Sequence, residues 1–590
     1  MSSEDKSWMT PLIKLMINER WRAFREKNWP VYVHLTTKVK ESIITAKRLW
    51  AEKLKSKTLA GAWNVVNHVK GQHNRGFTTN LVTKHGSNQA VANLVAGHIS
   101  SIFSKSSFCG AATEIIDDHW SIQVSEAEVR RLLRQSKQHK APGCDAVPTK
   151  IYVLLSEVIA KPLARIIEWS INSRTFPTEW KSGVVIPIPK KKSFHSVSNI
   201  RPLTLYPLPS KLCEKIVKQR LDKVIGSSIS VTQHGFRQGA STTTAVVKIM
   251  DSALHIRDES DNFGVAVVSF DFSRAFDCLE HDLMVKKLAA QMFPRGFLLW
   301  LQSYLGARTS KVKVNDAFSP EFAIQKGVPQ GTVLGPSLFS CFTSDLVCFS
   351  ETSTMVNYAD DTNIIIPIKG NDGSRILASI QCEVDHIERW CEENHLRLNR
   401  EKSCFILSTK HPTFLPSSPP IPQRESLKIL GITLNSKLDW SEHISDIQKR
   451  ANRQFHAMKL LKPLMTQSEL HTVYTATIRS LMEYCCPAFV SLPRFLSERL
   501  EKIGKRAHRI IYGESASTAC TCSHKDIERR RIIISRALLR SIEKKEDHLL
   551  RGILPERLPR SGHYSLPYCR THKYQHSFMP FMSAIANSEV

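Results

Sequence analysis

The sequence predicts an α+β fold in which antiparallel strands carry an acidic site and helices lie behind them. The apolar stretches 355–359 and 363–367 flank the acidic pair 360–361, a pattern typical of a β-hairpin with carboxylates at its tip. A further apolar run, 265–270, ends at Asp271 and predicts a buried strand. Much of the remaining chain shows helical spacing of its apolar residues, so strands and helices are mixed.

The chain before residue 265 is expected to be mainly helical. Residues 8–70 form basic helical segments, whereas 71–119 show no clear pattern. Ser125 and Glu128 match a capping box, which predicts a helix from there to about residue 135. Residues 182–189 run into alternating Ile and Pro and predict a strand. The spacing of apolar residues predicts three more helices, at 149–173, 212–224 and 242–256.

The chain after Asp271 is expected to mix helices with short strands. The expected helices are 282–292, 296–305, 376–391 and an apolar helix after the Gly- and Pro-punctuated segment 327–336. The expected strands are 403–408, 427–434 and a hairpin of 311–314 with 321–325. Beyond Trp440 the pattern is helical and basic, with turns near 462–463 and 486–487.

The charge of the chain is strongly one-sided. Its 590 residues include 82 Lys and Arg against 54 Asp and Glu, a net charge of +28. Residues 1–110 hold 17 Lys and Arg against 6 acidic residues, and residues 441–590 hold 25 against 14. The acidic pair therefore lies in a nearly neutral middle between two basic flanks. Solubility alone would be served by mixed charges, so the flanks predict a polyanionic partner.

The cysteines predict a reducing environment. The 14 Cys show neither an even disulfide framework nor C-x₂-C pairs. Scattered reduced cysteines are favoured over a zinc site, whose conceivable ligands would be Cys520, Cys522, His524, His563, Cys569 and His572. No apolar run is long enough to span a membrane, and the N-terminus lacks a secretory signal. We therefore expect an intracellular protein without a membrane partner.

The acidic residues suggest a site for divalent cations. Strands that present Asp271 and Asp360 side by side could hold two metal ions about 3.5–4 Å apart, which suits phosphoryl or nucleotidyl transfer. Asp361 would be a further ligand or would shape the local field. Taken singly, an ordinary turn at 360–361 and a strand-end cap at Asp271 are the simpler interpretations.

Six motifs occur in order along the chain. They are Asn-Ile-Arg-Pro-Leu-Thr-Leu at 199–205, Phe-Asp with Phe-Asp within 270–277, Gly-Val-Pro-Gln-Gly-Thr-Val-Leu-Gly-Pro at 327–336, Tyr-Ala-Asp-Asp at 358–361, Leu-Arg-Leu-Asn with Lys at 396–402, and Leu-Gly-Ile at 430–432. Together they resemble the reverse transcriptases of non-LTR (LINE-type, jockey-like) retrotransposons. The resemblance covers Lys140 to Lys462 strongly, and the segments to Gly513 and 570–587 more loosely.

The resemblance implies a right-hand polymerase with basic helical extensions at both ends. The implied domains are a linker-like N-terminal extension (1–119), fingers with part of the palm (120–260), a palm with an antiparallel sheet and the catalytic site (261–439), a helical thumb (440–513) and a basic C-terminal tail (514–590). The implied activity is RNA-directed DNA polymerisation, a nucleotidyl transfer from dNTPs to a DNA 3′-OH on an RNA template.

The resemblance also implies how metal ions are held. Asp271 and Asp360 would bind two Mg²⁺ ions, with Mn²⁺ as an alternative, and Asp361 would complete the catalytic triad. The backbone carbonyl of Phe272 would help to hold the metal ion of the nucleotide.

Five further residues are implied to surround the incoming nucleotide. Arg201 and Lys190 would contact its triphosphate, since a planar guanidinium suits bidentate phosphate binding. Gln330 would lie beneath the nucleotide and the template base, where Gly331 allows close approach of the backbone. Phe276 falls on the position where a ring would crowd a ribose 2′-OH and favour deoxynucleotides.

The last implied roles belong to basic residues. Lys402 is a candidate general acid that would protonate the pyrophosphate leaving group, although a surface lysine is the common case. Lys502, Lys505, Arg506 and Arg509 recur at helical spacing and would grip the phosphates of the template–primer duplex. A solvated helix face is the alternative for these four.

The resemblance leaves other interpretations open. Autonomous elements of this family usually carry an endonuclease before the polymerase, and we expect none in this chain. A truncated or domesticated copy that only binds nucleic acid is the main alternative, and a group II intron-type maturase is a third. The expected partners are an RNA template, a DNA primer or target, and dNTPs, in a ribonucleoprotein of the nucleus or cytoplasm.

Overall fold

The chain divides into two compact units in its computed structural model. The first unit comprises residues 1–74 and 440–537, and the second comprises 75–439 and 538–590. The residues that the structure describes are 8–54, 63–67, 81–103, 118, 120–190, 197, 200–328, 330–416, 418–513 and 527–588. The N-terminal helices therefore share a unit with the helices that follow Asp439.

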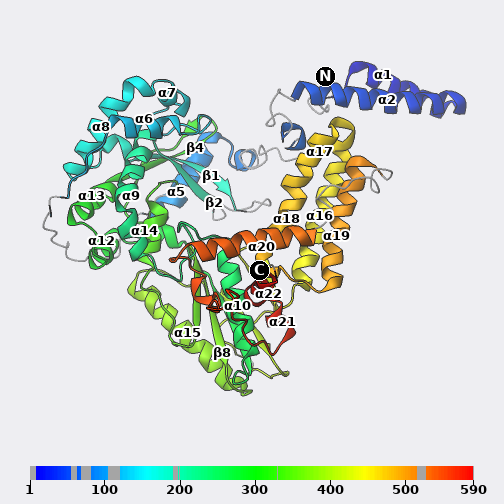
Figure 1. Ribbon diagram of the computed structural model, residues 1–590. Coiled ribbons are helices and arrows are strands. Elements are labelled where there is room, and N and C mark those ends of the chain that lie inside the picture. Colours follow the sequence, from blue (N-terminus) through cyan, green and yellow to red (C-terminus); the bar gives the residue numbers. More distant parts are fainter. Residues whose placement is uncertain are drawn as a thin grey trace. The chain divides into compact units, whose positions relative to one another are not determined.

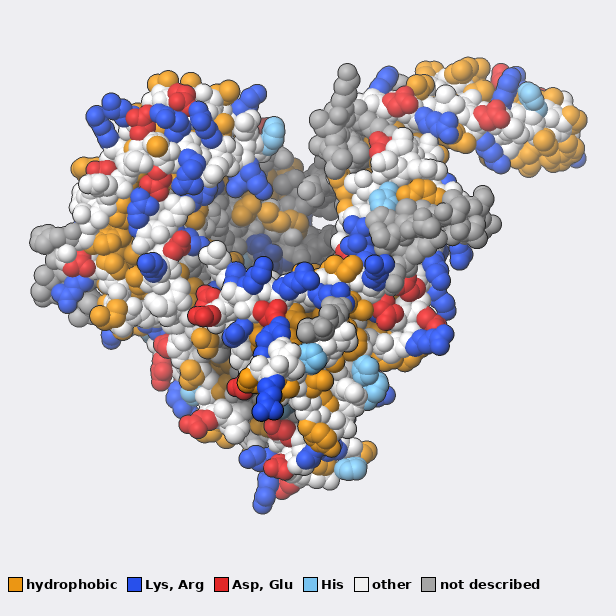
Figure 2. All heavy atoms as spheres, viewed as in Figure 1, with side chains coloured by type: hydrophobic (Ala, Val, Ile, Leu, Met, Phe, Trp, Pro, Cys, Tyr) orange, Lys and Arg blue, Asp and Glu red, His pale blue; other side chains and the backbone are white. Residues whose placement is uncertain are grey.

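The first unit begins with a pair of packed helices, α1 (Pro11–Arg25) and α2 (Trp29–Leu54). The hydroxyl of Thr10 accepts a hydrogen bond from the Ile13 N–H and caps α1, as expected for this residue type before a helix. Large apolar side chains near the turn between the helices remain exposed: Trp21, Phe24, Trp29 and Val33. Figure 2 shows hydrophobic side chains in orange on the surface of this helix pair.

A helical bundle follows in the same unit. Its main helices lie side by side in Figure 1: α16 (Ser441–Leu461), α17 (Gln467–Tyr474), α18 (Ser480–Glu483) and α19 (Arg494–Tyr512). Short 3₁₀ turns at Lys462–Leu464 and Cys486–Phe489 contain the predicted Pro breaks. Helix α20 (Ile527–Lys544) is the next helix among the described residues. The helical prediction for this segment is confirmed.

The second unit contains a four-stranded antiparallel sheet with the order β7-β8-β3-β9. Its strands are β7 (Thr354–Tyr358), β8 (Asp361–Ile368), β3 (Gly264–Phe270) and β9 (Cys404–Thr409). Strand β3 is central and almost wholly buried, which explains its unbroken apolar run. Helices α10 (Thr242–Asp258) and α15 (Gly373–Glu393) pack against this sheet (Figure 1).

A second sheet of five strands has the order β2-β1-β4-β5, with β6 also paired to β4. Its strands are β1 (Ser182–Pro189), β2 (Ile200–Leu205), β4 (Arg308–Val314), β5 (Ala317–Phe318) and β6 (Phe322–Ile324). Helix α5 (Asn88–Phe103) packs on this sheet through Val91, Val95 and Ile99. A segment without a readable sequence pattern thus contributes a helix to the second unit.

The remaining helices of the second unit share one large apolar core with the four-stranded sheet. They are α6 (Glu126–Arg134), α7 (Thr149–Leu154), α8 (Ser156–Asn172), α9 (Leu208–Ser228), α11 (Ala275–Cys278), α12 (His281–Ala290), α13 (Arg295–Leu305) and α14 (Gly335–Phe342). The Ser125 hydroxyl accepts from the Glu128 N–H, so the predicted cap of α6 is present, but the Glu128 carboxylate accepts from Arg220 and does not complete a capping box.

Two predicted elements are each divided in the structure. The expected helix 149–173 breaks at Leu155, which ends α7 and begins α8. Leu154 and Leu155 are exposed, so the apolar spacing there did not reflect a continuous buried face. The expected strand 427–434 is a hairpin of β10 (Ser426–Ile429) and β11 (Ile432–Asn435). Its turn holds Leu430 and Gly431 at φ 48° and 84°, the left-handed conformation of tight hairpins.

The C-terminal segment belongs to the second unit. Helices α21 (His572–Gln575) and α22 (Phe578–Asn587) pack on α10, where the Asp258 carboxylate accepts hydrogen bonds from the Arg570 and Thr571 N–H groups. Among the conceivable zinc ligands, Cys520, Cys522 and His524 lie outside the described residues. The helices in the described part of the chain include none that is long and apolar enough to cross a membrane.

Candidate active site

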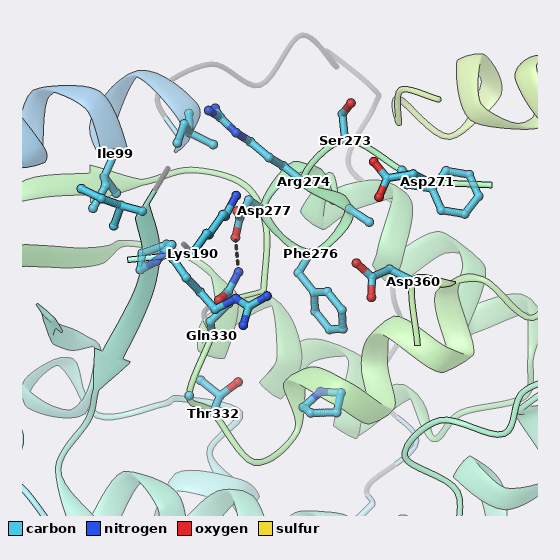
Figure 3. Close-up of a pocket in the computed structure, with 18 of the residues that line it drawn as sticks. Ile99, Lys190, Asp271, Ser273, Arg274, Phe276, Asp277, Gln330, Thr332 and Asp360 are labelled. Atoms are coloured by element: carbon cyan, nitrogen blue, oxygen red, sulfur yellow. Dashed lines mark hydrogen bonds between the residues drawn. The ribbon is translucent and has the colours of Figure 1, made fainter. Parts of the chain in front are cut away.

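A cavity of about 750 Å³ in the second unit collects most of the predicted site residues (Figure 3). Strand β2 of the five-stranded sheet, loops at the ends of β3 and β7, helix α5 and the segment after β6 contribute to its wall. The predicted residues that line it are Lys190, Arg201, Asp271, Phe272, Phe276, Gln330, Gly331, Asp360 and Lys402. Residues that are up to 212 positions apart in the sequence thus meet at one site.

The pairing of the four-stranded sheet brings Asp271 and Asp360 to this cavity. Strand β3 ends at Phe270, which is paired with Thr362 of β8, and Asp271 follows directly. Tyr358 pairs with Asp361 across the β7–β8 hairpin, so Ala359 and Asp360 form its two-residue loop. The predicted hairpin with acidic residues at its tip is therefore confirmed, and its second strand, β8, lies beside β3.

Hydrogen bonds fix the main chain of Asp271 from the side opposite the β7–β8 hairpin. Its N–H donates to the Ser403 hydroxyl at 3.1 Å, and its carbonyl accepts from the Asn399 N–H at 2.8 Å. The Lys402 ammonium lies 3.4 Å from the Asp271 carboxylate. The segment that contains the predicted general acid is therefore packed beside the predicted metal ligand.

The acidic side chains repel one another in a partly dehydrated place. Partial burial raises the pKa of Asp360, and the charge of Asp271 raises it further. Partial burial also raises the pKa of Asp361, to about 6, with the charges of Asp360 and Asp271 adding to the effect. A cation bound between the carboxylates would relieve this repulsion.

The donor set fits a hard divalent cation. In the described part of the chain, no three His, Cys, Asp or Glu side chains are grouped so that they could hold a metal ion. Three carboxylates line the cavity, Asp271, Asp277 and Asp360, and that of Asp277 is buried and accepts a hydrogen bond from Gln330. Asp271 and Asp360 are left as candidate ligands, and Mg²⁺ commonly takes one or two carboxylates from the protein and the rest of its ligands from phosphates and water. Asp361 does not line the cavity.

The backbone of Phe272 adds an oxygen donor on the same side. Phe272 forms an antiparallel bridge with Leu398, and the flanking hydrogen bonds join Asp271 to Asn399 and Ser273 to Arg397. In this pattern the N–H and C=O of Phe272 point away from the Leu398 strand. Phe272 lines the cavity, and its carbonyl is not used in the pairing with Leu398.

The ring of Phe276 is fixed by two other aromatic rings. It stacks on Phe339 with ring centroids 4.1 Å apart and an interplanar angle of 18°. Phe236 meets it edge-on at 6.3 Å. Phe236 also lines the cavity and is 48% exposed, so it is a site residue that the sequence motifs did not reveal. In Figure 3 the ring of Phe276 lies between Asp360 and Gln330.

Gln330 and Gly331 belong to a loop that packs tightly against its surroundings. The Gln330 amide donates to the buried Asp277 carboxylate at 3.2 Å, and burial raises the pKa of Asp277 to about 6. Gly331 has φ 117°, and a Cβ there would lie 2.2 Å from the Thr204 carbonyl oxygen. The need for glycine at 331 thus arises from packing against β2.

Cationic side chains line the same cavity as the carboxylates. They are Lys190, Arg201 and Arg274; His98 also lines the cavity, and neither Arg274 nor His98 was predicted. Burial lowers the pKa of Lys190, and the charge of Arg274 lowers it further. Burial likewise lowers the pKa of His98, with Arg274 and Lys190 adding to the effect. This concentration of positive charge suits an anionic ligand that also contacts a cation between the carboxylates.

The four predicted cations of α19 lie in the first unit. Lys502, Lys505, Arg506 and Arg509 are exposed, whereas Ile503, Ala507 and Ile510 on the other face are buried. Arg506 donates to the Asn452 side chain at 2.9 Å and lies over the ring of Phe455. The helical spacing and the shared face of these cations are confirmed.

The sequence is similar to known polymerases of mobile elements. Residues 188–434 match the family model described as reverse transcriptase (RNA-dependent DNA polymerase). The probable RNA-directed DNA polymerase from transposon BS of Drosophila melanogaster is 27% identical over 500 residues, which cover 79% of this chain and 55% of that protein. The RNA-directed DNA polymerase from mobile element jockey of the same organism is 30% identical over 370 residues, which cover 59% and 39%.

The chain spans about half the length of these curated relatives. Among solved structures, a telomerase from Candida tropicalis in complex with a TWJ fragment of telomeric RNA aligns over 75% of this chain and 66% of that one. Its TM-score of 0.37 and identity of 13% are too low to bear on fold or function. The predicted α+β class is confirmed, and residues 188–434 are a reverse transcriptase domain similar to those of non-LTR retrotransposons.

Proposed function

We propose that this chain is an RNA-directed DNA polymerase that extends a DNA 3′ end on an RNA template with dNTPs. The single observation that carries this proposal is the cavity in which Asp271 and Asp360 face a group of cationic side chains. A deoxynucleoside triphosphate has an anionic tail that would neutralise the cations. Its reactive phosphate would then lie beside the carboxylates.

The proposed reaction is an in-line displacement. The primer 3′ oxygen forms a bond to the α-phosphorus, the bond to the pyrophosphate oxygen breaks, and the 3′ proton is released. Two divalent cations, when bound, would supply activation of the 3′-OH and stabilisation of the leaving group. Asp271, Asp360 and the Phe272 carbonyl are the donors that would hold them.

The other cavity residues would orient the nucleotide. Arg201 and Lys190 would bind the triphosphate, with Arg274 close to Lys190. The Phe276 ring, braced by Phe339, would crowd a 2′-OH and so favour deoxynucleotides. Gln330, anchored by Asp277, would contact the nucleotide or template base. Positioning and electrostatics of this kind account for most catalysis of phosphoryl transfer.

Three further roles are proposed, for Lys402, Asp361 and the cations of α19. Lys402 pairs with Asp271, and it would have to leave that carboxylate to protonate pyrophosphate. Asp361 lies outside the cavity wall, and it would act through its charge on Asp360. The cations of α19 would bind the phosphates of the template–primer duplex in a salt-dependent way.

The test is incorporation of labelled dNTPs on an RNA template with an annealed DNA primer and Mg²⁺. We expect template-directed extension by the wild-type chain and almost none by Asp271→Asn, with equal binding of the primer–template by both proteins. Salt-sensitive RNA binding without incorporation under any metal condition would instead support a nucleic-acid-binding protein without polymerase activity.

A further inference from the structure

The loop that carries Asp360 contains a strained residue. Ala359 has φ 56°, a left-handed conformation that is unfavourable for a residue with a Cβ. Glycine or asparagine is the usual residue at such a hairpin position. A strained conformation persists when its surroundings hold it in place, so the contacts of Ala359 decide where Asp360 points.

The side chain of Gln233 holds this residue by both of its main-chain polar groups. Its Oε1 accepts from the Ala359 N–H at 2.9 Å, and its Nε2 donates to the Ala359 carbonyl at 3.2 Å. Oε1 also accepts from the Gly235 N–H at 2.7 Å, which fixes the orientation of the amide. Gln233 is only 2% exposed, so little water competes for these bonds.

The backbone on either side of Gln233 reinforces the contact. The His234 N–H donates to the Asn357 carbonyl at 2.7 Å, and the Asn357 N–H donates to the Thr232 carbonyl at 2.8 Å. Gln233 thereby forms a parallel bridge with Asn357 of β7. A Cβ on Gly235 would lie 2.3 Å from the Ala359 nitrogen, so only glycine permits this approach. The segment 232–235 thus follows β7 up to the loop.

We propose that Gln233 is a positioning residue that holds Ala359 in its left-handed conformation and so directs the Asp360 carboxylate into the cavity. Its link to metal binding rests on the proposed function of Asp360. Without the Gln233 amide, Ala359 would relax to a conformation with negative φ, and Asp360 would lose its fixed distance from Asp271. Outer contacts of this kind typically change metal affinity or activity by about 10- to 100-fold.

Replacement of Gln233 by methionine tests this role, because methionine has a similar volume and cannot replace the hydrogen bonds. Gln291→Met is the matched control: Gln291 donates to the Cys341 carbonyl and the Ser344 hydroxyl, and it does not line the cavity. Binding of Mn²⁺ alone would be measured by the electron paramagnetic resonance of free Mn²⁺, together with kcat for dNTP incorporation and thermal unfolding.

We expect Gln233→Met to bind Mn²⁺ at least tenfold more weakly than wild type and to lose kcat by a similar factor, whereas Gln291→Met stays within about twofold. Adding Ala359→Gly to Gln233→Met should recover part of the loss, since glycine adopts the left-handed conformation without strain. Rescue at Ala359 would not follow from a general loss of core packing.

Several results would overturn the proposal. They are wild-type Mn²⁺ affinity in Gln233→Met, an equal loss in both methionine variants, and failure of Gln233→Met to fold even with Ala359→Gly. Folding of the double variant alone would support the proposal, because it would identify strain at Ala359 as what Gln233 compensates. If the Mn²⁺ results are as expected but the wild type incorporates no dNTP, the polymerase function fails while the positioning role stands.

Discussion

The acidic cavity and the exposed face of α19 differ in how their charged side chains are arranged. At the cavity, partial burial raises the pKa of Asp360, and the charge of Asp271 raises it further. On α19, the four cations are exposed on the face opposite the buried residues, although Arg506 also contacts Asn452 and Phe455. The first arrangement concentrates a strong local field, whereas the second spreads charge along a surface.

This difference separates two kinds of function. A concentrated field acts on one atom of a ligand, so a single side chain can decide the outcome. Charges spread along a surface act through their combined field, which salt screens over about 10 Å at 0.1 M. Each single residue therefore contributes little to binding. The expected effects of substitution below follow this division.

The largest effect should come from the acidic pair, where neighbouring carboxylates have different positions. We expect Asp360→Asn to lower kcat by at least roughly 10³-fold, a typical loss when a group that stabilises transition-state charge is removed. Asp361→Asn should cost less, because Asp361 does not line the cavity. Single-turnover dNTP incorporation measures both. Equal losses in the two variants would contradict the distinction between them.

The second effect concerns the choice of sugar. Phe276→Val would remove the ring that Phe339 braces and open space beside the nucleotide. The ratio of kcat/KM for dNTP to that for rNTP should fall by roughly 10- to 200-fold, the range that steric pockets usually provide. Incorporation of dNTP should persist, which serves as the internal control. An unchanged ratio would show that Phe276 contributes only to packing and does not select the sugar.

The third effect tests the spread charge. Replacing the four α19 cations (Lys502, Lys505, Arg506 and Arg509) with glutamine should weaken binding to a primer–template duplex and reduce its salt slope by about 0.9 for each lost phosphate contact. Any one replacement should have a small effect. The matched control replaces four exposed cations of the second unit, Arg131, Lys150, Lys161 and Arg165. Equal loss in both quadruple variants would show that α19 has no special role.

The smallest effect concerns the buried imidazole of His234, which stays uncharged. Burial lowers the pKa of His234 to about 3, and the charges of Lys248, His548 and Arg237 lower it further. The unfolded chain takes up this proton near pH 6.5. The contribution of the neutral ring to the free energy of unfolding is therefore at its full value above pH 6.5. This contribution falls as the pH drops toward 3, by at most about 1.4 kcal/mol per pH unit.

His234→Asn should remove this part of the acid sensitivity, because the amide can still bond to the Thr244 hydroxyl, which the ring contacts at 2.9 Å, without titrating. Chemical unfolding of both proteins between pH 4 and 7 measures the slope. The same slope in wild type and variant would mean that another group takes up the proton.

The features that could be predicted from sequence are those with a local cause. The loop at Asp360, strand β3 and the cap at Ser125 follow from neighbouring residues, and the structure contains all three. The division of the expected strand 427–434 also has a local cause, because Gly431 is a turn signal. The roles of the site residues were inferred from the family resemblance, because no single motif is enough to identify a metal ligand.

The features that were missed depend on contacts between distant segments. Gln233 lies 126 residues before Ala359, and nothing near it in the sequence indicates a hydrogen bond to that loop. The same holds for His98 of α5 and for Phe236, which meet the site only when the two sheets assemble. The left-handed φ of Phe236, at 59°, is a structural fact that its residue type does not suggest.

The central claim is that Asp271 and Asp360 act as one site although different segments supply them. A double-mutant cycle tests it most directly, with single-turnover dNTP incorporation measured for wild type, Asp271→Asn, Asp360→Asn and the double variant. We predict that the double variant is no slower than the slower single variant within about threefold, because groups that act as a unit give strongly non-additive losses. Losses that multiply would contradict the claim, since each aspartate would then contribute independently.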